Sequence, residues 1–249
     1  MDWPEDCLYE QPYPRLLAGL LDEGFLLRPL SAAPASRVVQ LRHDVEFDVA
    51  MAKRMAGAEA GLGVQSTYFI GIRSPFFNIL DATVAAMIHD IHQLGHEIGL
   101  HFIGELGDGD LTSRIDDDIL TTRKLLGLAD INLVSIHAPG DLSGLHTMLA
   151  ERHFSIYRRV SQQTQRYVSD SGGSWGTNLR TVLTDPPPHG VQLLTHPHWW
   201  RGFAPSPLER LAELSILTGR VGLDPRLEGF TPSLWRSAHT IRNSNAHEG

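Results

Sequence analysis

Acidic and imidazole side chains recur at the ends of apolar, strand-like segments of this sequence. They are Asp44, His101, His137, Asp170 and His196. In a parallel barrel the carboxyl ends of the strands meet at one mouth, where active sites are built. Carboxylates and imidazoles that converge on one point bind a divalent metal ion, and further acids and histidines beside it move protons. The pattern therefore predicts a metal-dependent hydrolytic site.

Alternation along the strands indicates which of these side chains share a face. In the strand that His101 closes, apolar residues occupy the alternate positions, so His101 is expected to point toward the barrel axis. By the same alternation Arg42, Asp44 and Glu46 share one face, and His43 lies on the opposite, apolar face. Two carboxylates and an imidazole from a neighbouring strand are thus predicted to meet.

Strand-like and helix-like segments alternate along the chain, which is typical of parallel β/α units. Strands are predicted over 38–41, 65–70, 97–102, 133–137 and 191–196, shorter strands over 155–160, 167–170 and 180–183, and helices over 47–60, 79–94, 111–126 and 207–217. The first thirty residues are also predicted to be helical. We expect a single α/β domain over 1–249, with a helical extension over 1–36 and a loop-rich tail over 222–249.

The composition argues against several kinds of function. The net charge is −8 and there is no basic run, so nucleic acid is not an expected partner. Cys7 is the only cysteine, which excludes an intrachain disulfide and a Cys-rich zinc module. No apolar run is long enough to span a membrane, and the acidic start lacks the features of a signal peptide. These features predict a cytoplasmic protein.

Six short motifs, taken in order, resemble the polysaccharide deacetylase family with the NodB-type domain. They are LRHDVE (41–46), STYF (66–69), GHEIGLH (95–101), SIHAP (135–139), YVSD (167–170) leading to Trp175, and LLTHP (193–197) before Trp199 and Trp200. The resemblance covers roughly 13–200. In particular it looks like the divergent branch found in bacterial lipopolysaccharide O-antigen clusters.

The resemblance implies a distorted parallel (β/α)7 barrel, related to the TIM barrel, with one divalent metal ion. Zinc is the first expectation and manganese the next. The family's first motif carries a catalytic base and a metal ligand, which implies Asp44 as the base and Glu46 as the ligand. Its second motif implies His101 as a ligand, and its last motif implies His196 as the catalytic acid.

The sequence departs from the family pattern at two ligand positions. A second histidine normally follows His101 by four residues, where this chain has Glu105, and Glu46 replaces an aspartate. We expect Glu46, His101 and Glu105 to form the metal site, an oxygen-rich set that shifts preference away from zinc. Alternatively, Asp44 itself binds the metal, or the site is degenerate. His137 is a reserve candidate ligand near the substrate.

Other residues are expected to support catalysis or to bind the substrate. Arg42 would keep Asp44 ionised through its positive charge. The tryptophans would form an apolar wall against which a sugar ring stacks. The full set is Arg42, His137, Asp170, Trp175, Trp199 and Trp200.

The sequence thus predicts metal-assisted deacetylation of an acetamido sugar or glycan precursor in surface polysaccharide (O-antigen) biosynthesis, with carbohydrate as the partner. One alternative is a catalytically silent relative that binds a glycan or a partner enzyme, which Glu105 in place of histidine keeps open. Another is a metal-dependent hydrolase of a different C–N bond. Absence of bound metal would support the silent relative. Released acetate would support deacetylation and is not expected from a hydrolase of another C–N bond.

Overall fold

The computed structural model describes residues 13–104, 111–137, 154–155, 165–173, 184–201 and 206–217. The strands are β1 (Leu26–Arg28), β2 (Val38–Val45), β3 (Thr67–Ile70), β4 (Glu97–Phe102), β5 (Leu133–Ile136), β6 (Phe154–Ser155), β7 (Arg166–Ser169) and β8 (Val191–Thr195). The helices are α1 (Tyr13–Asp22), α2 (Val49–Gly61), α3 (Ala82–Gln93), α4 (Leu111–Leu126) and α8 (Pro207–Leu217), with short 3-10 segments η1 (Ser171–Gly173) and η2 (Pro197–Trp200).

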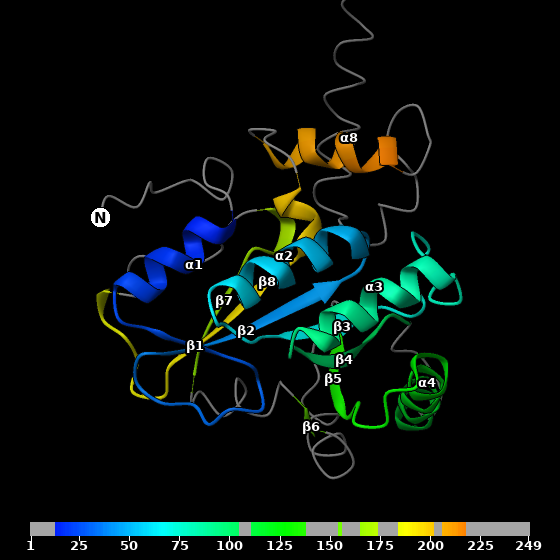
Figure 1. Ribbon diagram of the computed structural model, residues 1–249, viewed down its shortest axis with the longest axis horizontal. Helices are drawn as coiled ribbons and strands as arrows, with labels where there is room; N and C mark the ends of the chain where they lie inside the picture. Colours follow the sequence, from blue (N-terminus) through cyan, green and yellow to red (C-terminus); the bar gives the residue numbers. More distant parts are fainter. Residues whose placement is uncertain are drawn as a thin grey trace, which may run out of the picture.

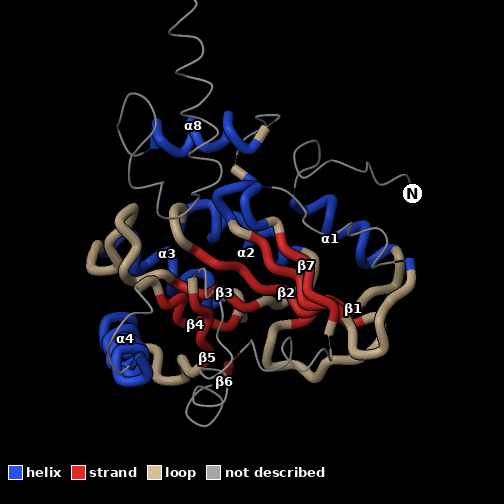
Figure 2. Tube along the Cα trace, turned by 180° about the vertical axis from the view of Figure 1, so that it is seen from behind, coloured by secondary structure: helices blue, strands red, loops and turns tan. Residues whose placement is uncertain are grey.

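The strands form one parallel sheet that curls into part of a barrel (Figures 1 and 2). Its main path runs β6-β5-β4-β3-β2-β8-β7, and β1 pairs with β2 off this path. The path follows the chain from β2 to β6 and returns through β7 and β8 to the other edge of β2. This is the order of a β/α barrel opened between β6 and β7, so the predicted distorted barrel is confirmed.

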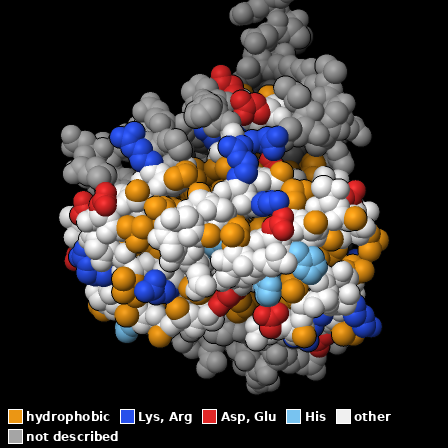
Figure 3. All heavy atoms as spheres, viewed as in Figure 1, with side chains coloured by type: hydrophobic (Ala, Val, Ile, Leu, Met, Phe, Trp, Pro, Cys, Tyr) orange, Lys and Arg blue, Asp and Glu red, His pale blue; other side chains and the backbone are white. Residues whose placement is uncertain are grey.

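Helices α1, α2 and α3 cover the outer face of the sheet, and Figure 2 shows the strands from the side that these helices leave open. Ile98 of β4 belongs to the same buried cluster as Ile88 and Ile91 of α3, as the alternation along β4 predicts. On the helical face, charged side chains of both signs are interspersed with hydrophobic ones (Figure 3). None of the described helices is long and apolar enough to cross a membrane.

An aromatic ring packs on the inner face of the sheet, beneath the carboxyl ends of the strands. Phe69 of β3 is fully buried and packs with Leu30 and Leu133. It needs Gly99 beside it, because a Cβ at that position would lie 2.6 Å from the Phe69 ring. The interior is therefore a packed core that supports the residues at the carboxyl ends of the strands.

Two boundaries differ from the sequence prediction. The first helix ends at Asp22, and residues 26–28, predicted to be helical, form β1, which pairs in parallel with β2. Gly24, with φ of +79°, turns the chain out of the helix. Strand β2 continues to Val45, beyond the predicted end at 41, because Arg42 to Val45 pair with β3. Residues 156–160 and 180–183, predicted as strand, lie outside the described residues.

A buried carboxylate ties the outer face of the sheet to the helices. Glu59 of α2 is 0% exposed and accepts hydrogen bonds from Tyr13 of α1, from Ser66 Oγ (2.6 Å) and from Tyr68 Oη (2.9 Å). His43 Nε2 lies 2.8 Å from it, which places His43 on the face opposite Asp44, as predicted. Burial raises the pKa of Glu59, but His43 and these donors outweigh it and hold the pKa below its usual value.

Replacing this carboxylate is expected to destabilise the protein strongly. Glu59→Ala leaves several buried donors without an acceptor, so we expect the free energy of unfolding to fall by about 3–5 kcal/mol. Urea denaturation at pH 7 measures this change. Glu23→Ala, at an exposed acid after α1, is the control, with an expected change within about 0.5 kcal/mol. Equal effects of the two substitutions would contradict the anchoring role.

Candidate functional site

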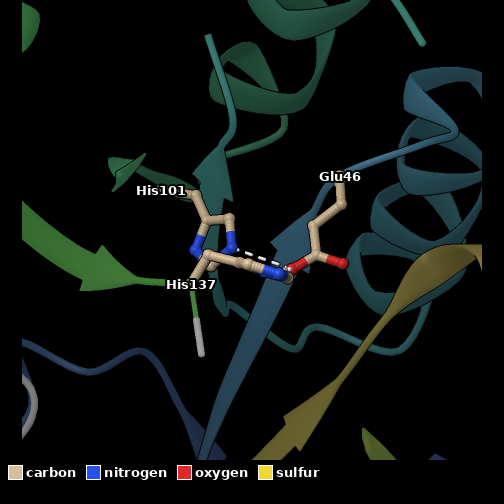
Figure 4. Close-up of side chains that lie close together, drawn as sticks. All are labelled: Glu46, His101 and His137. Atoms are coloured by element: carbon tan, nitrogen blue, oxygen red, sulfur yellow. Dashed lines mark hydrogen bonds and ion pairs between the residues drawn. The ribbon is translucent and has the colours of Figure 1, made fainter. Parts of the chain in front are cut away.

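Three side chains with metal-binding atoms converge at the carboxyl ends of neighbouring strands. Glu46 follows β2, His101 lies near the end of β4, and His137 follows β5. One ligand atom of each lies within 4.8 Å of those of the other two. His101 Nε2 is 2.9 Å and His137 Nδ1 is 2.6 Å from the same oxygen, Glu46 Oε1 (Figure 4). The three donors thus face a common point from three separate strands.

The chemistry of this group fits a divalent metal ion. A carboxylate with two imidazoles is a donor set of catalytic zinc sites, which leave a coordination position open. Glu46 and His101 are buried. Burial raises the pKa of Glu46, but the hydrogen bonds with His101 and His137 outweigh it and hold this pKa well below its usual range. The carboxylate is therefore charged at neutral pH, as a metal ligand must be.

His137 is the member of this group that the sequence placed only in reserve. The predicted third ligand, Glu105, and the predicted wall residue Trp175 both lie outside the described residues. Within the part of the chain that the structure describes, Glu46, His101 and His137 are the His, Cys, Asp or Glu residues that meet closely enough to hold a metal ion.

Asp44 lies next to this group on the inner face of β2. Its Oδ2 accepts hydrogen bonds from Arg42 Nη2 (2.7 Å) and Ser135 Oγ (3.2 Å), and it is 3.7 Å from His101 Nδ1. Burial raises the pKa of Asp44, but the Arg42 guanidinium outweighs it and holds the pKa below its ordinary value. Its other oxygen, Oδ1, is buried and has no hydrogen-bond partner among the residues that the structure describes. Asp44 is therefore an ionised carboxylate with one oxygen available to accept a proton.

Ser135 of β5 connects the two groups, and sequence analysis did not single it out. Its hydroxyl lies 3.1 Å from His101 Nδ1, 3.0 Å from Arg42 Nη2 and 3.2 Å from Asp44 Oδ2. A contact of this kind fixes the ring orientation of a ligating histidine. The available signal was its position two residues before His137, which puts it on the inner face of the same strand.

His196 and Asp170 form a second pair at the ends of β8 and β7. His196 Nδ1 is 2.6 Å from Asp170 Oδ1, and the His196 backbone N–H donates to both carboxylate oxygens. Burial lowers the pKa of His196, but the charge of Asp170 and the hydrogen bond to it outweigh this effect and raise the pKa to about 9. The imidazole is thus protonated at neutral pH. Because Asp170 contacts Nδ1, the Nε2 of His196 is left for other contacts.

The predicted tryptophan wall needs correction. Trp199 is 1% exposed, so its ring faces are covered by protein and offer no open platform for a sugar. Trp200 packs edge-on against Tyr13, with ring centroids 5.2 Å apart, and donates from Nε1 to Asp170 Oδ2 (2.9 Å). In the structure both tryptophans support the β8 end of the site.

Comparisons with known proteins return structural likenesses alone. No protein-family model and no curated protein matches the sequence. A CE4 esterase from Streptococcus mutans is 12% identical, with a TM-score of 0.47, over 76% of this chain and 79% of the other. The chitin deacetylase of Colletotrichum lindemuthianum is 15% identical, with a TM-score of 0.47, over 79% and 92%. A CE4 family pseudoenzyme from Bacillus anthracis is 15% identical, with a TM-score of 0.46, over 75% and 62%.

Proposed function

We propose that this protein is a metal-dependent hydrolase that removes the acetyl group from an acetamido sugar or glycan precursor. The observation that carries the proposal is the meeting of a Glu–His–His group with an ionised Asp44. A protonated His196 lies at the end of β8, which pairs with the strand that carries Asp44. Amide hydrolysis needs these three functions: a metal ligand set, a base and an acid.

Each residue has a distinct role in this mechanism. Glu46, His101 and His137 would hold the metal ion, which we expect to be zinc, with manganese as the alternative. When bound, such an ion polarises an amide carbonyl and makes water a stronger nucleophile at neutral pH. Asp44 Oδ1 takes the proton of the attacking water while Arg42 and Ser135 hold Oδ2.

The acid acts on the leaving group. His196 carries a proton at neutral pH, and because its Nδ1 is held by Asp170, its Nε2 donates the proton to the departing amine. The C–N bond breaks as the proton arrives, and the products are acetate and a free amino sugar. Surface polysaccharide (O-antigen) precursors made in the cytoplasm are the substrates that the sequence resemblance suggests, and they remain part of this proposal.

Acetate release tests the function directly. Protein reconstituted with zinc or manganese is incubated with a panel of acetamido sugars, and free acetate and free amine are measured with and without a chelator. Chelator-sensitive release of both products in equal amounts supports the proposal. Metal binding without acetate from any acetamido sugar would favour a hydrolase of another C–N bond, and absence of metal binding would favour a silent relative.

The alkaline side of the activity–pH profile is expected to report the pKa that Asp170 gives to His196. His196 must be protonated to act, so activity should decline as the pH rises past about 9. Asp170→Asn removes the charge that raises this pKa and leaves the burial that lowers it. We therefore expect the alkaline decline of kcat/KM to move down by at least about 1 pH unit.

The control is Asp185→Asn, which alters an exposed acid before β8 and should leave the profile unchanged. An alkaline decline that stays in place in the Asp170 variant would show that another group donates the proton.

A further inference from the structure

One imidazole beside the proposed acid has no hydrogen-bond partner among the described residues. His198, in η2, is 3% exposed, and within the described chain neither its Nδ1 nor its Nε2 has a partner. A buried polar atom that is left unpaired costs free energy, and nearly all such atoms in native proteins are paired. A histidine with both nitrogens unpaired in the core of a site is therefore a group that a ligand can complete.

The ring of His198 belongs to the same mouth as the proposed catalytic residues. Its centroid is 5.7 Å from that of His196, and 4.4 Å from that of Phe47, which directly follows the proposed ligand Glu46. The centroid of the Trp199 ring also lies 4.4 Å from that of His198. The two aromatic rings limit the rotation of His198, so it has little freedom to turn toward another partner.

The segment that carries His198 is itself fixed at both ends. The Trp199 backbone N–H donates to the His196 carbonyl (3.0 Å), and the Trp200 indole donates to Asp170. After η2, Arg201 pairs with Asp48, the N-cap of α2. These contacts hold η2 against the junction of β2 and α2, so the unpaired imidazole keeps a defined position.

The protonation state of the His198 ring limits which chemical groups can be its hydrogen-bond partner. Burial and the nearby charge of His196 lower the pKa of His198 to about 3, so the ring is neutral at physiological pH. A neutral imidazole has one nitrogen that donates and one that accepts. A neutral ring does not attract an anion, and the negative charge of Glu46, which acts on this ring, disfavours one. A hydroxyl group, which also both donates and accepts, matches it.

We propose that His198 is a specificity-determining residue that hydrogen-bonds a hydroxyl group of the sugar substrate. The proposal rests on the proposed function, since it assumes a sugar at this mouth. Phe47 and Trp199 hold the ring, and the sugar hydroxyl completes its hydrogen bonding. His198 therefore contributes to substrate affinity and selectivity, while Asp44 and His196 carry the proton transfers.

His96 is a matched control for this residue. It is 2% exposed, but its nitrogens are paired, with Nδ1 accepting from the Ser66 N–H (3.2 Å) and Nε2 lying 3.0 Å from the Ala56 carbonyl. His96 packs behind the sheet near the start of β4, away from the site. The same substitution at both histidines therefore compares the loss of a hydrogen-bonded ring, at His96, with the loss of a ring that has no partner in the described chain, at His198.

The test compares His198→Leu, His198→Gln and His96→Leu in metal-loaded protein. Melting temperature, metal content and calorimetric binding of N-acetylglucosamine, N-acetylgalactosamine and N,N′-diacetylchitobiose are measured for each. His198→Leu removes unpaired buried atoms, so its melting temperature should stay level or rise by about 2–4 °C. Its sugar dissociation constant should rise about tenfold at unchanged metal content, and His198→Gln should restore part of the affinity.

His96→Leu is expected to lower the melting temperature by several degrees and to leave sugar binding unchanged. The proposal is overturned if His198→Leu destabilises the protein as His96→Leu does, if it releases the metal, or if its sugar affinity equals that of the wild type. Absence of binding of all three sugars to the wild type also overturns it. Failure of the proposed function looks different: the wild type binds sugar through His198 but releases no acetate.

Discussion

Asp44→Asn is expected to reduce acetate release by about 10³-fold or more while the metal stays bound. The substitution removes the carboxylate that takes the proton of water, and loss of a general base costs about 10²–10⁴-fold. The amide keeps an acceptor oxygen for Arg42 and Ser135, so the local hydrogen bonds are disturbed little. Steady-state kinetics with each acetamido sugar, together with metal analysis of the same samples, measures the effect on kcat.

Glu97→Gln is the control for this experiment. Glu97 lies at the other end of the barrel, where it accepts a hydrogen bond from Thr67 Oγ1 (2.6 Å). We expect the kcat of Glu97→Gln to stay within about twofold of the wild-type value, because substitutions away from the site and the core usually have small effects. Equal activities of Asp44→Asn and the wild type, with metal present in both, would remove Asp44 from the mechanism.

His137→Ala is expected to lower the affinity for the metal by more than about 100-fold. Removing a residue that hydrogen-bonds a metal ligand already lowers the metal affinity by about 10–100-fold, and removing the ligand itself lowers it further. Metal stoichiometry after dialysis against a weak chelator measures the loss, and circular dichroism shows whether the fold is kept. His101→Ala is expected to behave in the same way, because its Nε2 faces the same Glu46 oxygen.

Glu105→Ala and His92→Ala complete the comparison. His92 lies on α3, on the outer side of the sheet, so its substitution should leave the metal in place. Retention of the metal in Glu105→Ala would leave Glu46, His101 and His137 as the ligand set. Loss of the metal there would add Glu105 to the set. Retention of the metal in His137→Ala would show that the convergence in Figure 4 does not bind it.

Strand alternation alone predicts the faces of the central strands. Arg42 and Asp44 share the inner face and His43 the outer, because side chains in a strand alternate regardless of what they contact. Helix α4 and strand β4 have the predicted bounds, since each has an unbroken apolar period. Local periodicity thus determined the element order and the end of the barrel at which the site lies.

The partners across the site could not be predicted in the same way. Which atoms meet depends on the curl of the sheet and on rotamers, so the sequence identified His137 only as a reserve candidate ligand near the substrate. The link made by Ser135 joins residues 34 and 91 positions away, which no local pattern records. Strand β1 was missed because three residues are too short to show alternation. The unpaired nitrogens of His198 likewise depend on neighbours from distant segments.

The pairing of β2 with β8 has a consequence for how the molecule is made. His43 Nδ1 meets Thr195 Oγ1 at 2.6 Å, although the two residues are 152 positions apart. One edge of β2 therefore stays unpaired during synthesis until β8 has left the ribosome, and contacts of such long range slow folding. Glu46, His101 and His137 all precede His196 by at least 59 residues. A nascent chain can thus gather the three proposed metal ligands well before the proposed proton donor has been made. If these roles hold, metal binding is expected to precede catalytic competence.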